Sequence, residues 1–296
     1  MGSHIRSIRA GGPAVRASAA GVLALAAGLP AAPAAADSVV LVSDRDNTLI
    51  QPMSGQPENS LGAGWQFYAG RVGNNGGGTI RRGLLRFDLS SIPPGSTITA
   101  VKLKLYMSQG NGATSTVSLK RCLADWGEGV SFGFGGGGAP AEENDATWTK
   151  RFYPGVAWGA AGGSFSATAS ASTSIPSQAA FYTWGSTAAM VADAKAWHAT
   201  PGSNFGWVVT GNEATIQTSK RFESRDSLTA AQRPQLTVWF VPPSQIVGDL
   251  NVDGAVNGAD LGLMLGTWGQ ANPSYDLDGS GTVDGGDLGL LLAHWT

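Results

Sequence analysis

The last part of the chain repeats one set of oxygen-bearing side chains at one spacing. The first copy begins at Asp249 and the second begins 27 residues later, at Asp276. In each copy, side-chain oxygens stand at positions 1, 3, 5, 9 and 12, and position 7 would offer its backbone carbonyl. The residues concerned are Asp249, Asn251, Asp253, Ala255, Asn257, Asp260, Asp276, Asp278, Ser280, Thr282, Asp284 and Asp287. This is the ligand spacing of an EF-hand-like calcium loop, so the sequence predicts two bound Ca²⁺ ions.

The residues between the ligand positions fit the same chemistry. Glycine stands at position 6 in both copies, Gly254 and Gly281, where the absence of a Cβ allows a sharp bend. Position 8 is apolar, and we expect Val256 and Val283 to hold the two loops together through a short β-contact. A pair of solvated turns is the alternative interpretation. The repetition of all five side-chain positions favours calcium.

Each loop continues into an apolar segment with the spacing of one helix face. The apolar positions are Leu261, Leu263, Met264, Leu265 and Trp268 after the first loop, and Leu288, Leu290, Leu291, Leu292 and Trp295 after the second. From 249 to 296 there are seven aspartates and no lysine or arginine, so the metal-free segment would repel itself. Because so small a unit buries little surface, we expect metal binding to contribute to its folding.

Two such loops, each ending in Asp-Leu and followed by a single helix, resemble a type I dockerin. The resemblance covers about 246–296. It implies a small α-helical C-terminal domain of paired calcium loops that attaches the protein to a cohesin-like or other surface partner. Positions 10 and 11 are Gly258-Ala259 and Gly285-Gly286 here, where that family carries a hydroxyl pair. The resemblance therefore supports calcium binding more than the choice of partner.

The N-terminus has the pattern of an export signal. Arg6, Arg9 and Arg16 accompany an apolar run over 17–29, and three alanines precede Asp37. The run is too short to span a membrane, so 1–36 is predicted to be a signal peptide of a secreted, extracellular or cell-surface protein. The net charge over 37–248 is +2, from 16 basic and 14 acidic residues, which does not indicate a nucleic-acid partner. Cys122 is the only cysteine, so no internal disulfide can form.

Residues 37–241 are predicted to form one mainly β domain, joined by a linker over 242–248 to the calcium module at 249–296. Residues 98–107 alternate between apolar and polar, the period of a half-buried strand. Further strands are predicted at 38–42, 83–89, 115–122, 205–210, 216–223 and 235–241, with one helix at 186–198. Many short strands separated by glycine-rich turns indicate a jelly-roll-like β-sandwich.

Short phrases along this domain occur in a characteristic order. They are LLRFDLSSIP at 84–93, DWGE at 125–128, ATW at 146–148, VAW at 156–158, GGSF at 162–165, AW at 196–197, NFGW at 204–207, FESRD at 222–226 and RPQL at 233–236. Together they resemble the DNRLRE-type domain, a secreted β-sandwich similar to carbohydrate-binding modules that recognise alginate and other polysaccharides. The tryptophans within these phrases, Trp126, Trp148, Trp158 and Trp207, are expected to pack inside the fold.

Aromatic residues near the glycine-rich loops are candidates for sugar contact. The rings of Trp65, Tyr68 and Trp184 could stack on the apolar C–H face of a sugar, and partial burial is the alternative. Near the start of the domain, Asp44 and Asp46 could hold a further Ca²⁺ or only form a turn.

Arginines near the same loops are the matching candidates for an acidic sugar. The guanidinium groups of Arg81, Arg82, Arg221 and Arg225 could bind uronate carboxylates in a bidentate manner. Solvated charges at strand edges are the alternative interpretation. A glycan site built from these candidates requires them to share one exposed face, the residues concerned being Trp65, Tyr68, Arg81, Arg82 and Arg221.

Catalytic signals are weak by comparison. The adjacent Glu142 and Glu143 would point apart, unlike a glycosidase pair, and neither His198 nor His294 has a nucleophile or metal motif beside it. We therefore expect a secreted non-catalytic protein that binds polysaccharide through the sandwich and attaches to a surface or scaffold partner through the calcium module. A structural subunit of an extracellular assembly is the alternative, and a polysaccharide lyase or hydrolase is a weaker one.

Overall fold

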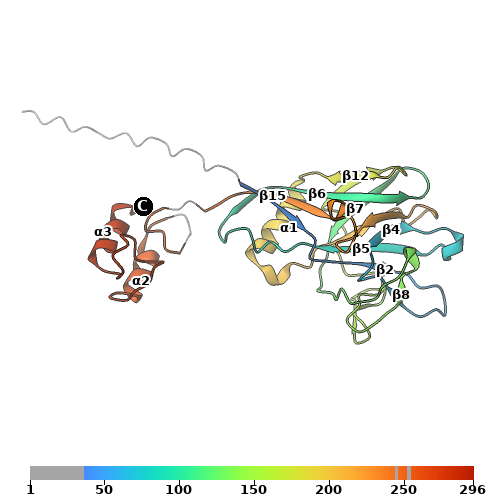
Figure 1. Ribbon diagram of the computed structural model, residues 1–296, viewed down its shortest axis with the longest axis horizontal. Coiled ribbons are helices and arrows are strands. Elements are labelled where there is room, and N and C mark those ends of the chain that lie inside the picture. The colour runs from blue at the N-terminus through green and yellow to red at the C-terminus, as the bar shows by residue number, and fades with distance from the viewer. Residues whose placement is uncertain (1–36, 244–245, 252–254) are drawn as a thin grey trace, which may run out of the picture. The chain divides into compact units, whose positions relative to one another are not determined.

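The computed structural model describes residues 37–243, 246–251 and 255–296 (Figure 1). The predicted signal peptide at 1–36 lies outside the described residues, as do Asp253 and Gly254 of the first loop. The described part is mainly β, with a curled antiparallel sheet formed within 37–241. The segment from 246 onward contains two short helices and is described separately.

The main sheet has the strand order β1-β15-β6-β14-β4-β5-β13-β7-β11, with β12 paired to β6 and β2 paired to β5. Its strands are β1 (Asp37–Val42), β2 (Arg45–Ile50), β4 (Gln66–Arg71), β5 (Ile80–Arg86), β6 (Thr97–Gly110), β7 (Ser115–Arg121), β11 (Ala171–Ile175), β12 (Ala180–Trp184), β13 (Trp207–Thr210), β14 (Lys220–Glu223) and β15 (Gln235–Val241). Two small ladders pair β3 (Asn59–Ser60) with β8 (Ala139–Pro140) and β9 (Lys150–Phe152) with β10 (Val156–Ala157). One helix, α1 (Ala188–Ala199), precedes β13.

The alternation in 98–107 correctly predicts the longest strand. Val101, Leu103 and Leu105 of β6 are fully buried, whereas the residues between them face outward. Every other predicted strand overlaps an observed one, although the segment 216–223 is a strand only from Lys220. Strand β2 was not predicted, because Asp46, Asn47 and Thr48 are polar and nevertheless buried. The alternation typical of a half-buried strand does not occur there, so the pattern does not predict a strand.

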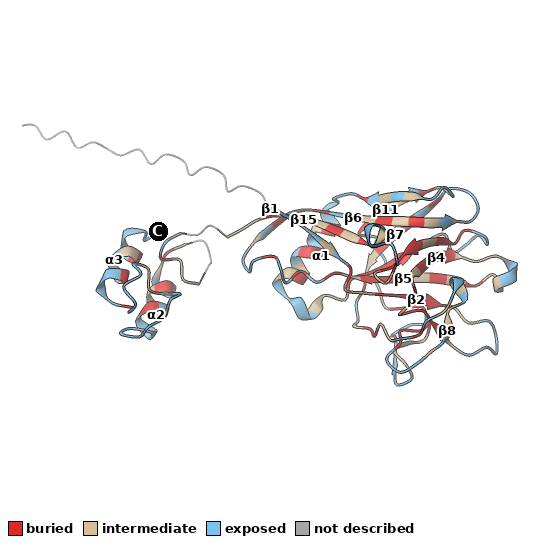
Figure 2. Cartoon of the chain, in the orientation of Figure 1, coloured by how far each residue is buried: buried red, intermediate tan, exposed pale blue. Residues whose placement is uncertain are grey.

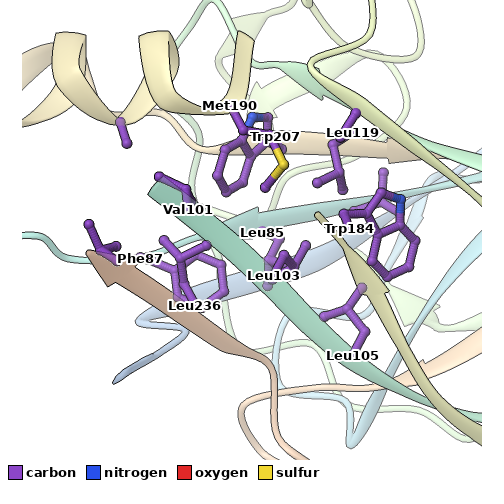
Figure 3. Packing of buried hydrophobic residues seen from close by; sticks show 14 of the residues in the cluster. Leu85, Phe87, Val101, Leu103, Leu105, Leu119, Trp184, Met190, Trp207 and Leu236 are labelled. Carbon is purple, nitrogen blue, oxygen red and sulfur yellow. The ribbon is translucent and has the colours of Figure 1, made fainter. Parts of the chain in front are cut away.

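The main hydrophobic core fills the inside of the curled sheet, where Figure 2 shows the buried residues of the strands concentrated. Helix α1 adds Met190, Ala194 and Trp197 to this core, and Met190 lies beside Trp207 in Figure 3. Thr187 caps the helix, since its hydroxyl accepts the N–H of Met190 at 3.1 Å. Trp184 is fully buried and donates its indole N–H to the carbonyl of Val117, so its expected stacking on a sugar is wrong.

A second hydrophobic cluster lies on the outer face of strands β2, β5 and β13, on the opposite side of these strands from the main core. It contains Leu49, Leu84 and Val208 from these strands and three tryptophans from the irregular segment 123–165. These are Trp126, Trp148 and Trp158, none more than 8 % exposed. The prediction that these tryptophans and Trp207 pack within the fold is confirmed. Long loops therefore cover one outer face of the sheet and leave another face open.

In the C-terminal segment, the helices α2 (Gly258–Gly266) and α3 (Gly285–Ala293) share a small core. Its buried members are Val256, Met264, Val283 and Leu291. The expected backbone contact between Val256 and Val283 is wrong. Val283 pairs instead with the residues after α2, donating to the Gln270 carbonyl and accepting from the N–H of Gly269. Val256 accepts from the N–H of Thr296, so each loop is tied to the segment that follows the other loop's helix.

Candidate functional site

The second acidic loop gathers three carboxylates into one small volume. One oxygen each from Asp276, Asp278 and Asp287 lies within 4.8 Å of the others. Gly281 has a φ of +94°, which fits the sharp bend expected at position 6. The hydroxyl of Ser280 donates to the Thr282 carbonyl at 3.2 Å, so the oxygens of positions 5 and 7 lie side by side. The donor set is oxygen-only and anionic, which suits a hard divalent cation.

Positions 9 and 12 of this loop have a second role that needs no metal. Asp284 caps α3 by accepting the N–H of Gly286 at 2.8 Å, and Asp287 reaches back to the N–H of Asp284 at 2.7 Å. This is a reciprocal capping box. Asp287 also accepts the N–H groups of Leu277 and Asp278 at 2.6 and 3.1 Å. These N–H donors lower its pKa although burial opposes them. Asp276 and Asp278 likewise accept backbone N–H groups of their own loop, from Ser280 and Gly281. The feature that points to a metal is therefore the convergence of the Asp276, Asp278 and Asp287 carboxylates.

The described part of the first loop has the same organisation. Asn257 caps α2, and Asp260 accepts the N–H groups of Leu250, Asn251 and Asn257 at 2.8, 3.1 and 2.9 Å. Burial would raise the pKa of Asp260, but these three donors together lower it. Asp249 and Ala255 are half-buried and Asn251 is exposed. Asp253 lies outside the described residues, so the ligand set of this loop is described only in part.

Two of the expected sugar-contact residues are buried beneath the loop that contains the 3₁₀ turn Gly135–Gly137. Tyr68 is 7 % exposed and Arg81 is 5 % exposed. Arg81 donates its Nε to the Gly136 carbonyl and one Nη to the hydroxyl of Thr79 at 2.8 Å. Burial raises the pKa of Tyr68 and lowers that of Arg81 to about 10. Both side chains hold the loop in place, so a role in stacking or carboxylate binding is not supported by their placement.

Two more expected residues pair with carboxylates of the protein itself. Arg82 forms a bidentate ion pair with Glu213, at 2.7 and 2.8 Å, and its guanidinium also lies 4.9 Å from the ring centroid of Trp148. Arg225 donates its Nε to Glu128 at 2.7 Å. The positive charge of each guanidinium is therefore already compensated by a carboxylate of the protein. The expectation that the candidate residues share one exposed face is therefore not met.

The remaining two expected residues keep accessible surface. Trp65 is half-buried against Phe132 and Phe134, with ring centroids 5.4 and 5.7 Å away. Arg221, on β14, donates its Nε to the hydroxyl of Ser108 on β6 at 2.9 Å. None of the ion pairs among the described residues involves Arg221. Its charge is therefore the one that could still meet an anionic ligand.

Arg225 belongs to a buried charge cluster around Asp46. Asp46 is 1 % exposed; its N–H donates to Glu128 at 2.9 Å, and its carboxylate accepts the N–H of Arg225 at 2.7 Å. Burial raises the pKa of Asp46 well above its ordinary value, and the nearby charges of Glu128 and Asp226 raise it further. Asp44, the other residue considered for a further Ca²⁺, pairs with Arg86 instead. The two aspartates therefore do not share a site.

The open face of the sheet carries a group of basic and aromatic side chains that are not among the predicted sugar-contact residues. On β6, Lys102, Lys104 and Tyr106 point outward between the buried Val101, Leu103 and Leu105. The Lys104 ammonium lies 4.8 Å from the ring centroid of Phe181 on β12. Phe181 and Tyr106 pack edge to face with centroids 4.9 Å apart, and Lys102 lies 6.0 Å from the Trp239 ring on β15.

We call this group, together with Arg221, the β6 face. Phe181 is 45 % exposed, and Trp239, Tyr106 and Lys104 are half-exposed. Glu223 is the acidic residue of β14 and is buried, where it accepts the hydroxyl of Ser227 at 2.7 Å. The net charge of this face is therefore positive. The alternation that predicted β6 already held the signal, since its polar positions are basic or aromatic.

No family model matches the chain, and no curated protein matches it. Among the described helices, none has both the length and the apolar character required to cross a membrane.

Proposed function

We propose that this protein binds an acidic polysaccharide through the β6 face of a jelly-roll-like sandwich. The observation that carries the proposal is the interleaving of Lys102, Lys104 and Tyr106 on one strand, flanked by Phe181 and Trp239. Aromatic rings offer apolar faces to the C–H groups of sugars, and ammonium groups attract uronate carboxylates. Arg221 adds a third positive charge close to Ser108 of the same strand.

Ordinary surface packing is the competing explanation for these residues. Exposed cation–π pairs contribute only about 0.5–1 kcal/mol each, so they do not by themselves require a ligand. The positive charge of the β6 face favours a bound ligand over surface packing alone. Three cations without a carboxylate partner among the described residues stand together on one open sheet face.

Affinity electrophoresis in gels that contain polyuronate tests the proposal. We expect the chain to be retarded by alginate or pectate and not by an uncharged glucan. Replacing both Lys102 and Lys104 by alanine should weaken binding by up to about thirtyfold, because two exposed charge contacts contribute up to about 1 kcal/mol each. Lys195→Ala is the matched control, since Lys195 is an exposed lysine on α1. Equal retardation in all gels would contradict the proposal.

We propose further that the C-terminal segment is a calcium-binding module with two EF-hand-like loops. The cluster of Asp276, Asp278 and Asp287 supports the second site, and the same spacing supports the first. When bound, Ca²⁺ would supply the positive charge that draws these carboxylates together. Isothermal titration of the full chain with CaCl₂ should then give two binding events. A chain that binds no calcium would leave the loops as capped turns.

Exposed apolar residues of this module support a protein partner. Leu265 and Trp268 after the first loop are 52 % and 44 % exposed, and their counterparts Leu292 and Trp295 are 51 % and 45 % exposed. Large apolar side chains left exposed in equivalent places mark an interaction surface. We propose that it docks on a cohesin-like or other surface protein. Calcium-dependent capture on an immobilised cohesin would support this choice, and capture that is independent of calcium would oppose it.

We propose a binding function rather than catalysis for the described residues. Glu142 and Glu143 are both exposed on a loop, and the Nε2 of His198 lies 3.1 Å from the Pro93 carbonyl. Neither arrangement supplies an acid and base on either side of a glycosidic bond. Incubation with alginate and pectate, followed by measurement of new reducing ends or unsaturated products, tests this part. Turnover above background would replace the binding proposal by an enzymatic one.

A further inference from the structure

One edge of the curled sheet is formed by β1, which stands at the end of the strand order. Among the described strands it pairs only with β15, from Asp37 opposite Phe240 to Val42 opposite Gln235. Just beyond this ladder, the N–H of Ser43 donates to the Pro234 carbonyl. Main-chain groups alternate in direction along a strand. The N–H and C=O groups of the even-numbered residues Ser38, Val40 and Val42 therefore point away from β15, toward the free edge.

This edge lacks the features that usually prevent strands from joining. β1 has six residues, and none of them is proline, glycine or lysine. Val40 is 59 % exposed and Val42 is 48 % exposed, while Val39 and Leu41 on the inner face are only partly buried. Natural edge strands are blunted by charges, proline or bulges, because unpaired backbone groups act as a template for another strand. An edge this regular and apolar is suited to pairing.

We propose that β1 pairs with β1 of a second copy of this chain, antiparallel about a two-fold axis at Val40. In this register Val40 faces Val40 of the second copy, and Ser38 faces Val42 in both directions. On the inner face Val39 faces Leu41. The hydrogen-bonding groups of the two edges then meet, because both copies present the same even-numbered residues. Two-fold dimers of this isologous kind are the commonest oligomers of soluble proteins.

Charge also favours a second copy as the occupant. Asp37 is the only charged residue of β1. It stands at the first position of the strand, away from the two-fold axis at Val40. In the proposed register it lies opposite Ser43 rather than opposite another carboxylate. The paired stretch is therefore free of like-charge contacts, and each exposed valine gains an apolar neighbour. A strand of unrelated sequence would have no such built-in match.

The dimer would place two β6 faces on one side of a continuous sheet. Val40 lies opposite Thr237, and Thr237 lies opposite Lys102, so all three share the outer face. From β6 through β15 and β1 to the second β6 there are five strand steps, about 24 Å at roughly 4.8 Å each. A long polysaccharide could then engage both faces, which raises avidity without new contacts. This consequence rests on the proposed polysaccharide function, whereas the dimer itself does not.

Sedimentation equilibrium of the full chain over a range of concentrations tests the dimer, with calcium and after chelation. We expect a monomer–dimer equilibrium that is weakened at least tenfold by Val40→Lys, which places two ammonium groups at the axis. Val40→Pro should act in the same way, because it removes the N–H at the free edge and leaves the ladder with β15 intact. Thr183→Lys is the matched control, since it adds the same charge on the outer face of β12, away from β1.

Circular dichroism and thermal unfolding of each variant show whether the monomer is intact. A chain that remains monomeric throughout would overturn the proposal, and so would a dimer that persists in both Val40 variants. A dimer that disappears on calcium chelation would assign the contact to the C-terminal module instead. If the dimer forms as proposed but no polyuronate binds, only the polysaccharide function fails. If binding occurs without dimers, only the edge pairing fails.

Discussion

The ammonium of Lys104 lies 4.8 Å from the ring centroid of Phe181, on the strand next to its own. The two side chains stand on the outer face of the sheet, and no ion pair among the described residues uses this lysine. The ammonium packs over the Phe181 ring, and its N–H groups that point away from the ring can still donate to a ligand. A carboxylate that approaches this face therefore meets a cation already held in position by an apolar surface.

Replacement of Lys104 by alanine should weaken polyuronate binding about fivefold, since one exposed charge contact contributes up to about 1 kcal/mol. The affinity of the unmodified chain should also fall as salt is added, because exposed charges are screened at high ionic strength. Isothermal titration at low and high salt measures both effects. Lys195→Ala should bind as the unmodified chain does, and an unchanged affinity of Lys104→Ala would remove this residue from the site.

Replacement of Asp278 by asparagine should abolish or weaken by roughly tenfold the second calcium site, because the affinity of such loops depends on the number of charged ligands. Asp278 is exposed, so the metal-free fold should not change. Terbium luminescence or calorimetry counts the sites that remain. The exposed Glu143, replaced by glutamine, serves as the control outside the module. Two unchanged calcium sites in Asp278→Asn would show that this residue is not a ligand.

Replacement of Arg82 by alanine should lower the free energy of unfolding by about 2 kcal/mol without changing polysaccharide affinity. The reason is the bidentate bond to Glu213, since hydrogen bonds between charged groups contribute roughly 1.5–3 kcal/mol. Urea denaturation measures the stability. The double variant with Glu213→Ala should lose less than the sum of the two single losses. If Arg82→Ala lost polysaccharide binding without losing stability, Arg82 would be a contact residue for the polysaccharide instead.

Asp46 should make the β domain less stable as the pH rises. Burial raises its pKa in the folded state above the unfolded value of about 3.9. Its stabilising contribution is therefore complete below that value and is lost as the pH rises through the folded pKa. Asp46→Asn should raise the melting temperature at neutral pH and flatten this dependence, while keeping an oxygen for the Arg225 N–H.

The pH dependence of stability expected from Asp88 is opposite to that expected from Asp46. Its pKa is lowered, chiefly by the N–H and hydroxyl of Ser90, so its contribution is lost as the pH falls through the folded pKa. Asp88→Asn should therefore reduce stability above about pH 4, the region where Asp88 is ionised in both states. Melting curves of both variants across the pH range check the pair. Identical profiles for the two variants would contradict the assigned causes.

The sequence predicted the elements whose pattern is local. The alternation in 98–107 correctly located β6, and the apolar residues around 186–198 correctly located α1. The partners of polar residues depend on distant segments and could not be predicted. Arg82 of β5 meets Glu213 in the loop that follows the neighbouring strand β13, and Arg81 meets the backbone of a glycine loop. The carbohydrate candidates were chosen for residue type beside loops, whereas the β6 face consists of residues whose outward direction only the strand register reveals.

The two acidic loops show the reverse case, because spacing within twelve residues is local. Even there, Asn257 with Asp260 and Asp284 with Asp287 are accounted for by helix capping. Only the three-dimensional arrangement shows that Asp276 and Asp278 approach Asp287 closely enough to share an ion. The predicted contact between Val256 and Val283 is wrong because the backbone of each valine pairs with another segment. Val256 pairs with Thr296, and Val283 pairs with Gly269 and Gln270.

The most direct test of the β6 face is an NMR titration of the full chain with a uronate oligosaccharide. We predict saturable shifts of the Trp239 indole N–H and of the Lys104 and Phe181 backbone amides. The buried Trp126 and Trp207 should not respond. Shifts confined to other surfaces, or none at a concentration of oligosaccharide that saturates a known uronate-binding protein, would contradict the account.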